Sequence, residues 1–205
     1  MATERTFFDG EAGQIESFVD QPANTPRGIA LICHPHPQYG GTPENKVVQT
    51  LAKAFVELGY IAVRPAFRGI GASEGTYDRG EGETVDIIDV AAQAEARYGQ
   101  MPTVLSGFSF GAYIQTRVAK EVTPERMVLV ATACGHLSGD RDYQTETVPA
   151  NTLVIHGEQD ETVPLQNVFD WARPQDLPIV VVPGADHFFH RRLHLIKALV
   201  LGAWR

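Results

Sequence analysis

The segment 107–111, Gly-Phe-Ser-Phe-Gly, matches the pattern G-x-S-x-G, which can carry a nucleophilic serine. It directly follows an apolar run at 103–106 and precedes a helical pattern, which is the strand–turn–helix context that this motif needs. In such a tight turn the Ser109 hydroxyl projects above a sheet, and the flanking glycines leave room for a strained backbone and for the helix. The alternative is a glycine-rich turn in which Ser109 only caps the helix. The context favours a nucleophile.

A serine hydroxyl is a poor nucleophile at neutral pH, so a positioned base must be present elsewhere in the chain. Two segments supply candidates, H-G-E-Q-D-E-T-V-P at 156–164 and P-G-A-D-H-F-F at 183–189. Each directly follows an apolar run, and ligand sites in open α/β sheets form just past the carboxyl ends of strands. The sequence therefore predicts a triad with Ser109 as nucleophile, His187 as general base and Asp160 as the carboxylate that orients the histidine.

Other ionisable groups compete for these roles. The rivals are Glu158, Glu161, Asp186 and His156. Asp186 precedes His187 directly, so its side chain points elsewhere and a role in the turn suits it better. We interpret His156 as a strand-end residue of the core.

Stabilisation of an oxyanion requires two backbone N–H groups, one from the residue after the nucleophile and one from the loop after the first central strand. Phe110 supplies the first. In the loop, Pro35 and Pro37 have no N–H, so His36 is the donor in that stretch, with residues 38–39 as later candidates. Aromatic side chains near these positions are candidate substrate-binding walls, namely Tyr39, Phe108 and Phe188.

Metal and nucleotide sites are not expected. Several histidines suggest metal binding, the last three with helical spacing, namely His34, His36, His187, His190 and His194. The chain lacks an H-E-x-x-H pattern, and a solvated basic face explains His190 better. The segment 69–71, Gly-Ile-Gly, lacks the third glycine of a dinucleotide-binding loop. We expect catalysis without a metal or cofactor.

Alternating apolar runs and helical patterns must position these residues. The expected buried strands lie at 29–33, 61–64, 103–106, 127–131, 152–155 and 179–182. The expected helices lie at 45–58, 83–98, 110–122, 164–172 and 187–201. Continuous apolar strands that alternate with helices predict an α/β fold with a doubly wound, mostly parallel sheet. Residues 6–8 and 15–19 suggest an antiparallel N-terminal hairpin at one edge. The stretch 134–148 is too short for a lid domain.

Composition favours one α/β domain over residues 1–205 that acts on small molecules. The formal net charge is −8 and the basic clusters are short, so nucleic acid is not an expected partner. No apolar run is long enough to cross a membrane, and the N-terminus does not resemble a signal peptide. Cys33 and Cys134 lie in apolar runs and are expected to be buried thiols, which fits the cytoplasm. The oligomeric state stays open, with a homodimer as one option.

These motifs together resemble the α/β-hydrolase superfamily, and more narrowly the small bacterial hydrolases related to dienelactone hydrolase. The shared features are H-P-H-P at 34–37, G-G at 40–41, R-G-I-G-A-S at 68–73 and the three triad segments. The resemblance spans nearly the whole chain and implies the α/β-hydrolase fold, with Asp160 and His187 completing the triad. The dienelactone hydrolases proper carry cysteine at the nucleophile position, where this chain has Ser109.

The expected activity is that of a serine carboxylesterase that cleaves small acyl esters through an acyl-enzyme on Ser109. The same triad also serves thioesterases and aminopeptidase-like amidases, so these remain alternatives. A further alternative, outside the enzymes, is a ligand-binding receptor with this fold and an idle triad.

Overall fold

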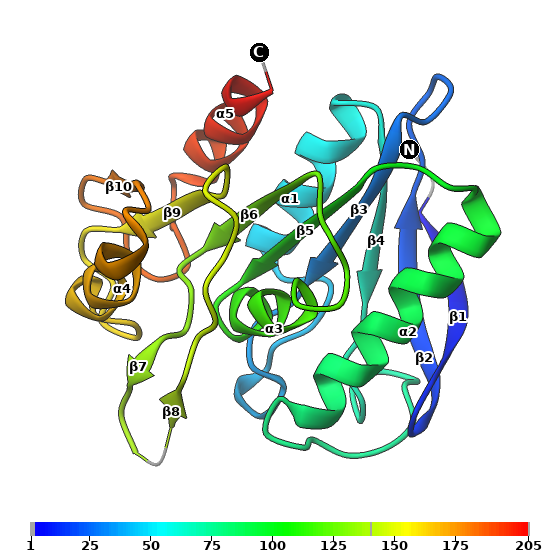
Figure 1. The fold of residues 1–205 in the computed structure, drawn as a ribbon, viewed down its shortest axis with the longest axis horizontal. Helices are drawn as coiled ribbons and strands as arrows, with labels where there is room; N and C mark the ends of the chain where they lie inside the picture. The colour runs from blue at the N-terminus through cyan, green and yellow to red at the C-terminus, as the bar shows by residue number, and fades with distance from the viewer. Residues whose placement is uncertain (1–2, 140, 205) are drawn as a thin grey trace.

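A sheet of eight strands runs through the computed structural model, which describes residues 3–139 and 141–204 (Figure 1). The strand order is β1-β2-β4-β3-β5-β6-β9-β10. The bounds are β1 Glu4–Gly10, β2 Gly13–Asp20, β3 Gly28–Cys33, β4 Tyr60–Pro65, β5 Thr103–Phe108, β6 Arg126–Val130, β9 Leu153–Gly157 and β10 Ile179–Val182. Strands β3, β4, β5, β6, β9 and β10 pair in parallel. Their carboxyl ends therefore meet at one edge of the sheet.

Helices cover both faces of this sheet. Helices α2, α3 and α4 lie on the face that is in front in Figure 1, and α1 and α5 lie on the other. The bounds are α1 Lys46–Glu57, α2 Glu81–Tyr98, α3 Phe110–Val118, α4 Leu165–Ala172 and α5 Leu193–Ala203, with short 3-10 helices η1 Pro37–Tyr39 and η2 Arg173–Gln175. Among the residues described, no helix is long and apolar enough to span a membrane.

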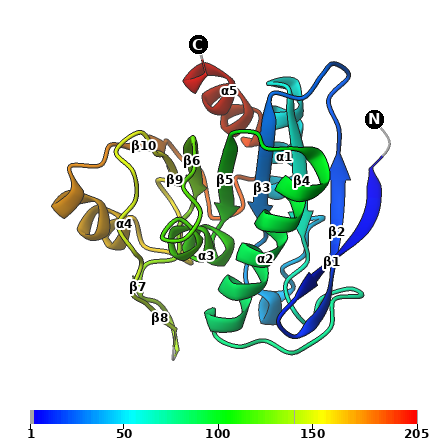
Figure 2. The ribbon, with the colours of Figure 1, turned by 45° about the vertical axis from the view of Figure 1, so that its right-hand side comes forward.

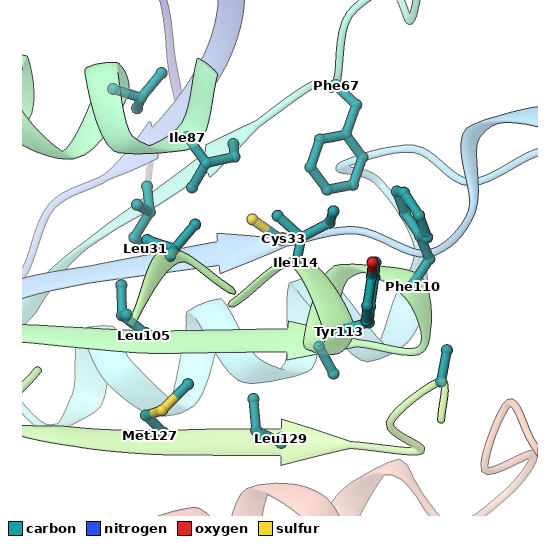
Figure 3. Close-up of a cluster of buried hydrophobic side chains, with 14 of the residues drawn as sticks. Leu31, Cys33, Phe67, Ile87, Leu105, Phe110, Tyr113, Ile114, Met127 and Leu129 are labelled. Carbon is teal, nitrogen blue, oxygen red and sulfur yellow. The ribbon is translucent and has the colours of Figure 1, made fainter. Parts of the chain in front are cut away.

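The central strands are apolar on both sides because both sides are covered. All residues of β3 and β4 are buried. Successive side chains point to opposite faces of a strand, so Leu31 and Cys33 pack under α2 and α3, whereas Ala30 and Ile32 pack against the α1 face. Figure 3 shows the first of these two cores, with Phe67 and Phe110 toward one end of the cluster.

The N-terminal hairpin was predicted correctly. Strands β1 and β2 pair antiparallel from Glu4 opposite Val19 to Gly10 opposite Gly13, and β2 pairs antiparallel with β4. The hairpin therefore extends the sheet beyond β4 and places β1 at its edge.

Two predicted helices were wrong in their bounds. The helix expected at 187–201 begins only at Leu193. Phe189 and Arg191 have positive φ values of 52° and 63°, which an α-helix does not allow, so 187–192 form turns instead. His187, His190 and His194 consequently do not share one helical face. The helix expected at 110–122 ends at Val118 and continues only as turns.

The segment between β6 and β9, in which no lid domain was expected, contains a small two-stranded ribbon. Strands β7 Gly135–His136 and β8 Asp142–Tyr143 pair antiparallel and form a separate two-stranded sheet. Figure 2 shows this ribbon extending away from the main sheet beside α4. The described residues between β6 and β9 form no lid domain, as predicted.

Candidate active site

Ser109 occupies the turn between β5 and α3 with φ of 57° and ψ of −119°, a conformation that residues with a side chain rarely adopt. Its N–H donates to Val130 O at 2.9 Å, which ties the turn to the neighbouring strand β6. Its carbonyl accepts from Ala112 N–H at 3.0 Å and begins the helix. Because β5 lies between β3 and β6, the turn is anchored in the middle of the sheet.

The two glycines of the motif are required by close backbone contacts. A Cβ atom on Gly107 would lie 2.4 Å from the carbonyl carbon and oxygen of Gly111. A Cβ atom on Gly111 would lie 2.3 Å from Cys33 O. Helix α3 can therefore approach β5 and β3 only because neither position carries a side chain.

The loops after β9 and β10 are joined by backbone hydrogen bonds. Glu158 N–H donates to Val182 O at 3.1 Å, and Gln159 N–H donates to Ala185 O at 2.8 Å. These bonds extend the pairing of the two strands into the loops, so Asp160 and His187 are brought face to face although 27 positions separate them.

Ser109, His187 and Asp160 form a continuous hydrogen-bonded series. His187 Nε2 lies 3.1 Å from Ser109 Oγ, and His187 Nδ1 lies 2.7 Å from Asp160 Oδ2. The ionised carboxylate can only accept, so Nδ1 carries the proton and Nε2 is free to accept from the serine hydroxyl. All three residues are buried.

Asp160 is held by its own turn, and the rival groups have other contacts. Its Oδ1 accepts from Thr162 N–H at 2.9 Å and from Val163 N–H at 2.8 Å. Asp186 Oδ2 instead lies 2.6 Å from His190 Nδ1, and its Oδ1 accepts from His190 N–H, as expected for a turn residue. Glu158 accepts from Gly184 N–H.

The loop after β3 is held by a buried histidine. His34 Nδ1 lies 2.7 Å from Pro35 O, and Nε2 accepts from Phe67 N–H at 3.0 Å. Burial lowers the pKa of His34 to about 3, so the imidazole is neutral and donates through Nδ1. It thereby joins the loop that carries His36 to the loop after β4.

The side chain of His36 contacts several residues near Ser109. Its ring packs at 4.8 Å from Phe110, Nδ1 accepts from Gln38 N–H, and Nε2 lies 3.1 Å from Tyr77 Oη. Burial, assisted by the charge of Arg141, lowers the pKa of His36 to about 4. Within the described residues, no hydrogen-bond acceptor is assigned to the backbone N–H of His36 or Phe110, the two groups predicted to bind an oxyanion.

Sequence reasoning missed a buried ion pair between the loop after β4 and α2. Arg68 donates to both carboxylate oxygens of Asp86, at 2.7 and 2.9 Å, and to Gly82 O at 3.0 Å. Both partners of this pair are buried. The pair ties the loop after β4 to α2. No periodic pattern links residues from a loop and a helix in this way.

The three predicted substrate-binding side chains have different surroundings. Tyr39 is 66% exposed and packs beside His36, and Phe188 is 47% exposed and lies edge-on to the His187 ring. Phe108 is fully buried, with its ring 4.9 Å from that of His187. The expectation that Phe108 lines a pocket is therefore wrong, because its alternation within β5 turns the side chain into the core.

The thiols and the other histidines supply no metal site. Among the residues that the structure describes, no cluster of three or more His, Cys, Asp or Glu side chains could hold a metal ion. Cys33 and Cys134 are buried free thiols, as predicted. Burial raises the pKa of the Cys134 thiol to about 12.

Comparison with known families identifies the class of this chain. The family model described as serine aminopeptidase, S33 matches residues 24–143, more than half of the chain. The chain therefore belongs to this family of α/β hydrolases, in agreement with its sheet and its lidless architecture.

Individual relatives support the same assignment over nearly the full length. The chain is similar to an uncharacterized protein of Rickettsia prowazekii (strain Madrid E), with 30% identity over 89% of this chain and 81% of that protein. A lidless α/β serine hydrolase of Xanthomonas campestris superposes with a TM-score of 0.89 at 35% identity and covers 99% of this chain and 94% of its own. An α/β serine hydrolase homologue of Coxiella burnetii gives 0.88 at 38% identity, covering 100% and 99%.

Proposed function

We propose that this chain is a serine carboxylesterase that cleaves small acyl esters through a covalent acyl-enzyme on Ser109. The hydrogen-bonded series from Ser109 Oγ through His187 to Asp160, with distances of 3.1 and 2.7 Å, carries the proposal. Its position at the carboxyl edge of the parallel strands, where α/β sheets bind ligands, supports it further.

In the first step His187 acts as general base. Its Nε2 removes the proton of Ser109 Oγ as the oxygen attacks the ester carbonyl carbon, and a tetrahedral oxyanion forms. Asp160 holds Nδ1 protonated and stabilises the imidazolium. The N–H groups of Thr162 and Val163 donate to Asp160 Oδ1 and hold the carboxylate in this orientation.

The negative charge is received by backbone N–H groups of Phe110 and His36. Removal of one such donor typically costs about 3 kcal/mol of transition-state stabilisation. His187 then gives its proton to the leaving alcohol, and the acyl group stays on Ser109. Water attacks the carbonyl carbon of this ester as His187 takes a proton of the water. His187 then returns that proton to Ser109 Oγ as the bond between Oγ and the acyl carbon breaks, and the carboxylic acid leaves.

The open architecture supports this proposed substrate class. Among the residues that the structure describes, no lid domain covers the site, and the exposed rings of Tyr39 and Phe188 pack beside His36 and His187. They offer an apolar rim to a short acyl or alcohol group. The site suits small or externally presented acyl groups better than long acyl chains, which require a deep apolar channel.

Labelling with a fluorophosphonate probe, followed by peptide mass spectrometry, tests the proposal. A covalent adduct is expected on Ser109 and is expected to disappear in Ser109→Ala. Ser138→Ala, a change of an exposed serine in the β7–β8 ribbon, is the matched control and should label as the unmodified protein does. Ser109 that stays unlabelled, without ester turnover, would overturn the proposal and favour a receptor with an idle triad.

A second candidate is an aminopeptidase-like amidase, favoured by the description of the family model that the chain matches. The triad chemistry is shared, so the leaving group decides between the two. Rates on p-nitrophenyl acetate, acetyl-CoA and aminoacyl anilides separate esterase, thioesterase and amidase activity. A higher kcat/KM on the anilides than on the ester would replace the first candidate with the second.

We also propose that residues 1–205 act as a single domain in the cytoplasm, on a small-molecule acyl substrate and without a cofactor. The one main sheet and the reduced thiols support this assignment.

A further inference from the structure

His156 is a buried histidine that the proposed mechanism does not use. It lies near the end of β9, four positions before Asp160, and is fully buried. Its Nε2 lies 3.0 Å from Val163 O and 3.5 Å from Asp160 Oδ2. The imidazole is thus in contact with the turn that presents the carboxylate to His187.

The contacts of His156 determine its tautomer. A carbonyl oxygen can only accept, so Nε2 carries a proton and donates it to Val163 O. Burial lowers the pKa of His156, so the ring is neutral and Nδ1 is unprotonated. Within the described part of the chain, Nδ1 has no hydrogen-bond partner. An unpartnered polar atom in a protein core is costly, and leucine or methionine at this position would avoid that cost.

Polar contacts link His156, Val163 and Asp160 to one another. Val163 O accepts from His156, and Val163 N–H donates to Asp160 Oδ1 at 2.8 Å. The carbonyl oxygen of Val163 is therefore held by a residue of β9, and its N–H is held by the Asp160 carboxylate. Asp160 Oδ2 meanwhile faces two imidazole nitrogens, that of His187 at 2.7 Å and that of His156 at 3.5 Å.

We propose that His156 is a positioning residue, which holds the 160–163 turn so that Asp160 presents Oδ2 to His187. This inference rests on the proposed function. The N–H at Nε2 is the essential feature, since it anchors Val163 O and directs positive potential toward Oδ2. Without it the turn can relax, and misplacement of a catalytic group by about 1 Å can lower a rate about 100-fold.

A matched pair of substitutions isolates this N–H. Glutamine places an amide N–H near the position of Nε2, whereas methionine has similar length without a donor. His156→Met is expected to lower kcat on p-nitrophenyl acetate about 10- to 100-fold, with KM within about twofold. His156→Gln is expected to stay within about threefold of the unmodified protein. Rates are expressed per active site titrated with the fluorophosphonate, so that unfolded protein does not contribute.

A double-mutant cycle tests whether the effect passes through Asp160. In an Asp160→Asn background, His156→Met is expected to lower kcat by less than about twofold, since the carboxylate it positions is gone. A role in stability alone would leave kcat per titrated site unchanged in both backgrounds, and that result would overturn the proposal.

The remaining outcomes are also decisive. Equal losses in His156→Gln and His156→Met would show that the N–H is not the essential feature. If His156→Met does not fold, a loss of more than about tenfold in His156→Gln would overturn the proposal by itself. Absence of labelling in the unmodified protein would instead overturn the proposed function, and this inference with it.

Discussion

The two halves of the candidate site are held in different ways. Ser109 sits after a central strand, and its place is set by backbone: a positive φ, two glycines and a hydrogen bond to β6. His187 follows β10 at the edge of the sheet. Backbone hydrogen bonds join its loop to the loop after β9, and its ring contacts the side chains of Asp160 and Phe108. The position of the proposed nucleophile depends on a local turn, whereas that of the proposed base depends on several loops.

This difference predicts different responses to mutation. Changes at the glycines beside Ser109 meet closely packed backbone atoms and should act mainly on stability. Changes around His187 remove hydrogen bonds or contacts between loops and should act mainly on rate. Four experiments separate these cases.

Asp160→Asn should have the largest effect. The amide presents a donor to His187 or leaves the wrong nitrogen protonated, and in the serine-protease example this change lowers kcat by about 10⁴-fold. We expect a loss of that order in kcat on p-nitrophenyl acetate. Circular dichroism should show that the fold is retained. Asp186→Asn, which changes an exposed carboxylate, should stay within about twofold. A loss of less than tenfold in Asp160→Asn would show that another group orients the imidazole.

Gly111→Ala should break the half held by backbone. The new Cβ would lie 2.3 Å from Cys33 O, so α3 must move away from β3. We expect a loss of about 3 kcal/mol or more in the free energy of unfolding, measured by urea denaturation. Gly202→Ala in α5 is the matched control, since its Cβ meets nothing within 4 Å, and should stabilise by about 0.5 kcal/mol. Similar stabilities for the two variants would contradict the close-contact argument.

Acid should lower the free energy of unfolding, because buried neutral histidines hold parts of the fold together. The pKa values of His34 and His36 are lowered to about 3 and 4, below the unfolded value of about 6.5, so the unfolded chain binds protons first as the pH falls. Their contribution is complete above pH 6.5 and is lost as the pH falls toward 4 and 3.

The slope of the free energy of unfolding against pH tests this prediction. Each such histidine should lower the free energy of unfolding by up to about 1.4 kcal/mol per pH unit between pH 6.5 and 5. Urea denaturation at pH 7.5, 6.5 and 5 should show this decline, and His36→Asn should reduce it. An unchanged slope in that variant would mean that His36 is protonated in the folded protein.

Phe188→Ala should have the smallest effect. The ring is about half exposed and contacts His187 edge-on, so its loss removes rim area without disturbing the core. We expect KM for p-nitrophenyl acetate to rise about 3- to 10-fold, equivalent to about 1 kcal/mol, with kcat within about twofold. Phe7→Ala removes a partly exposed ring from the edge strand β1, away from the site, and should leave both constants unchanged. A fall in kcat alone would assign Phe188 to support of the imidazole instead.

Much of the fold was predictable because its signals are local. The apolar runs of the central strands reflect burial on both faces, and the 107–111 motif requires a particular turn whatever surrounds it. The start of α5 was not predictable from periodicity, because Leu193, Ile196 and Val200 continue a pattern that Phe189 begins by chance. Phe189 is buried, but its backbone φ of 52° places it in a turn.

The sequence by itself determined the order of the candidate catalytic residues along the chain, the turn at Ser109 and a short set of candidate acids and bases. Only the tertiary structure decided that Asp160 rather than Asp186 faces His187, that Phe108 packs behind the imidazole, and that His156 contacts the Asp160 turn. Within the site, Asp160 and Ser109 lie 27 and 78 positions from the histidine that both contact, His187. Spacing along a chain constrains neighbours within a helix or strand, whereas the approach of separate loops depends on the packing of the whole sheet.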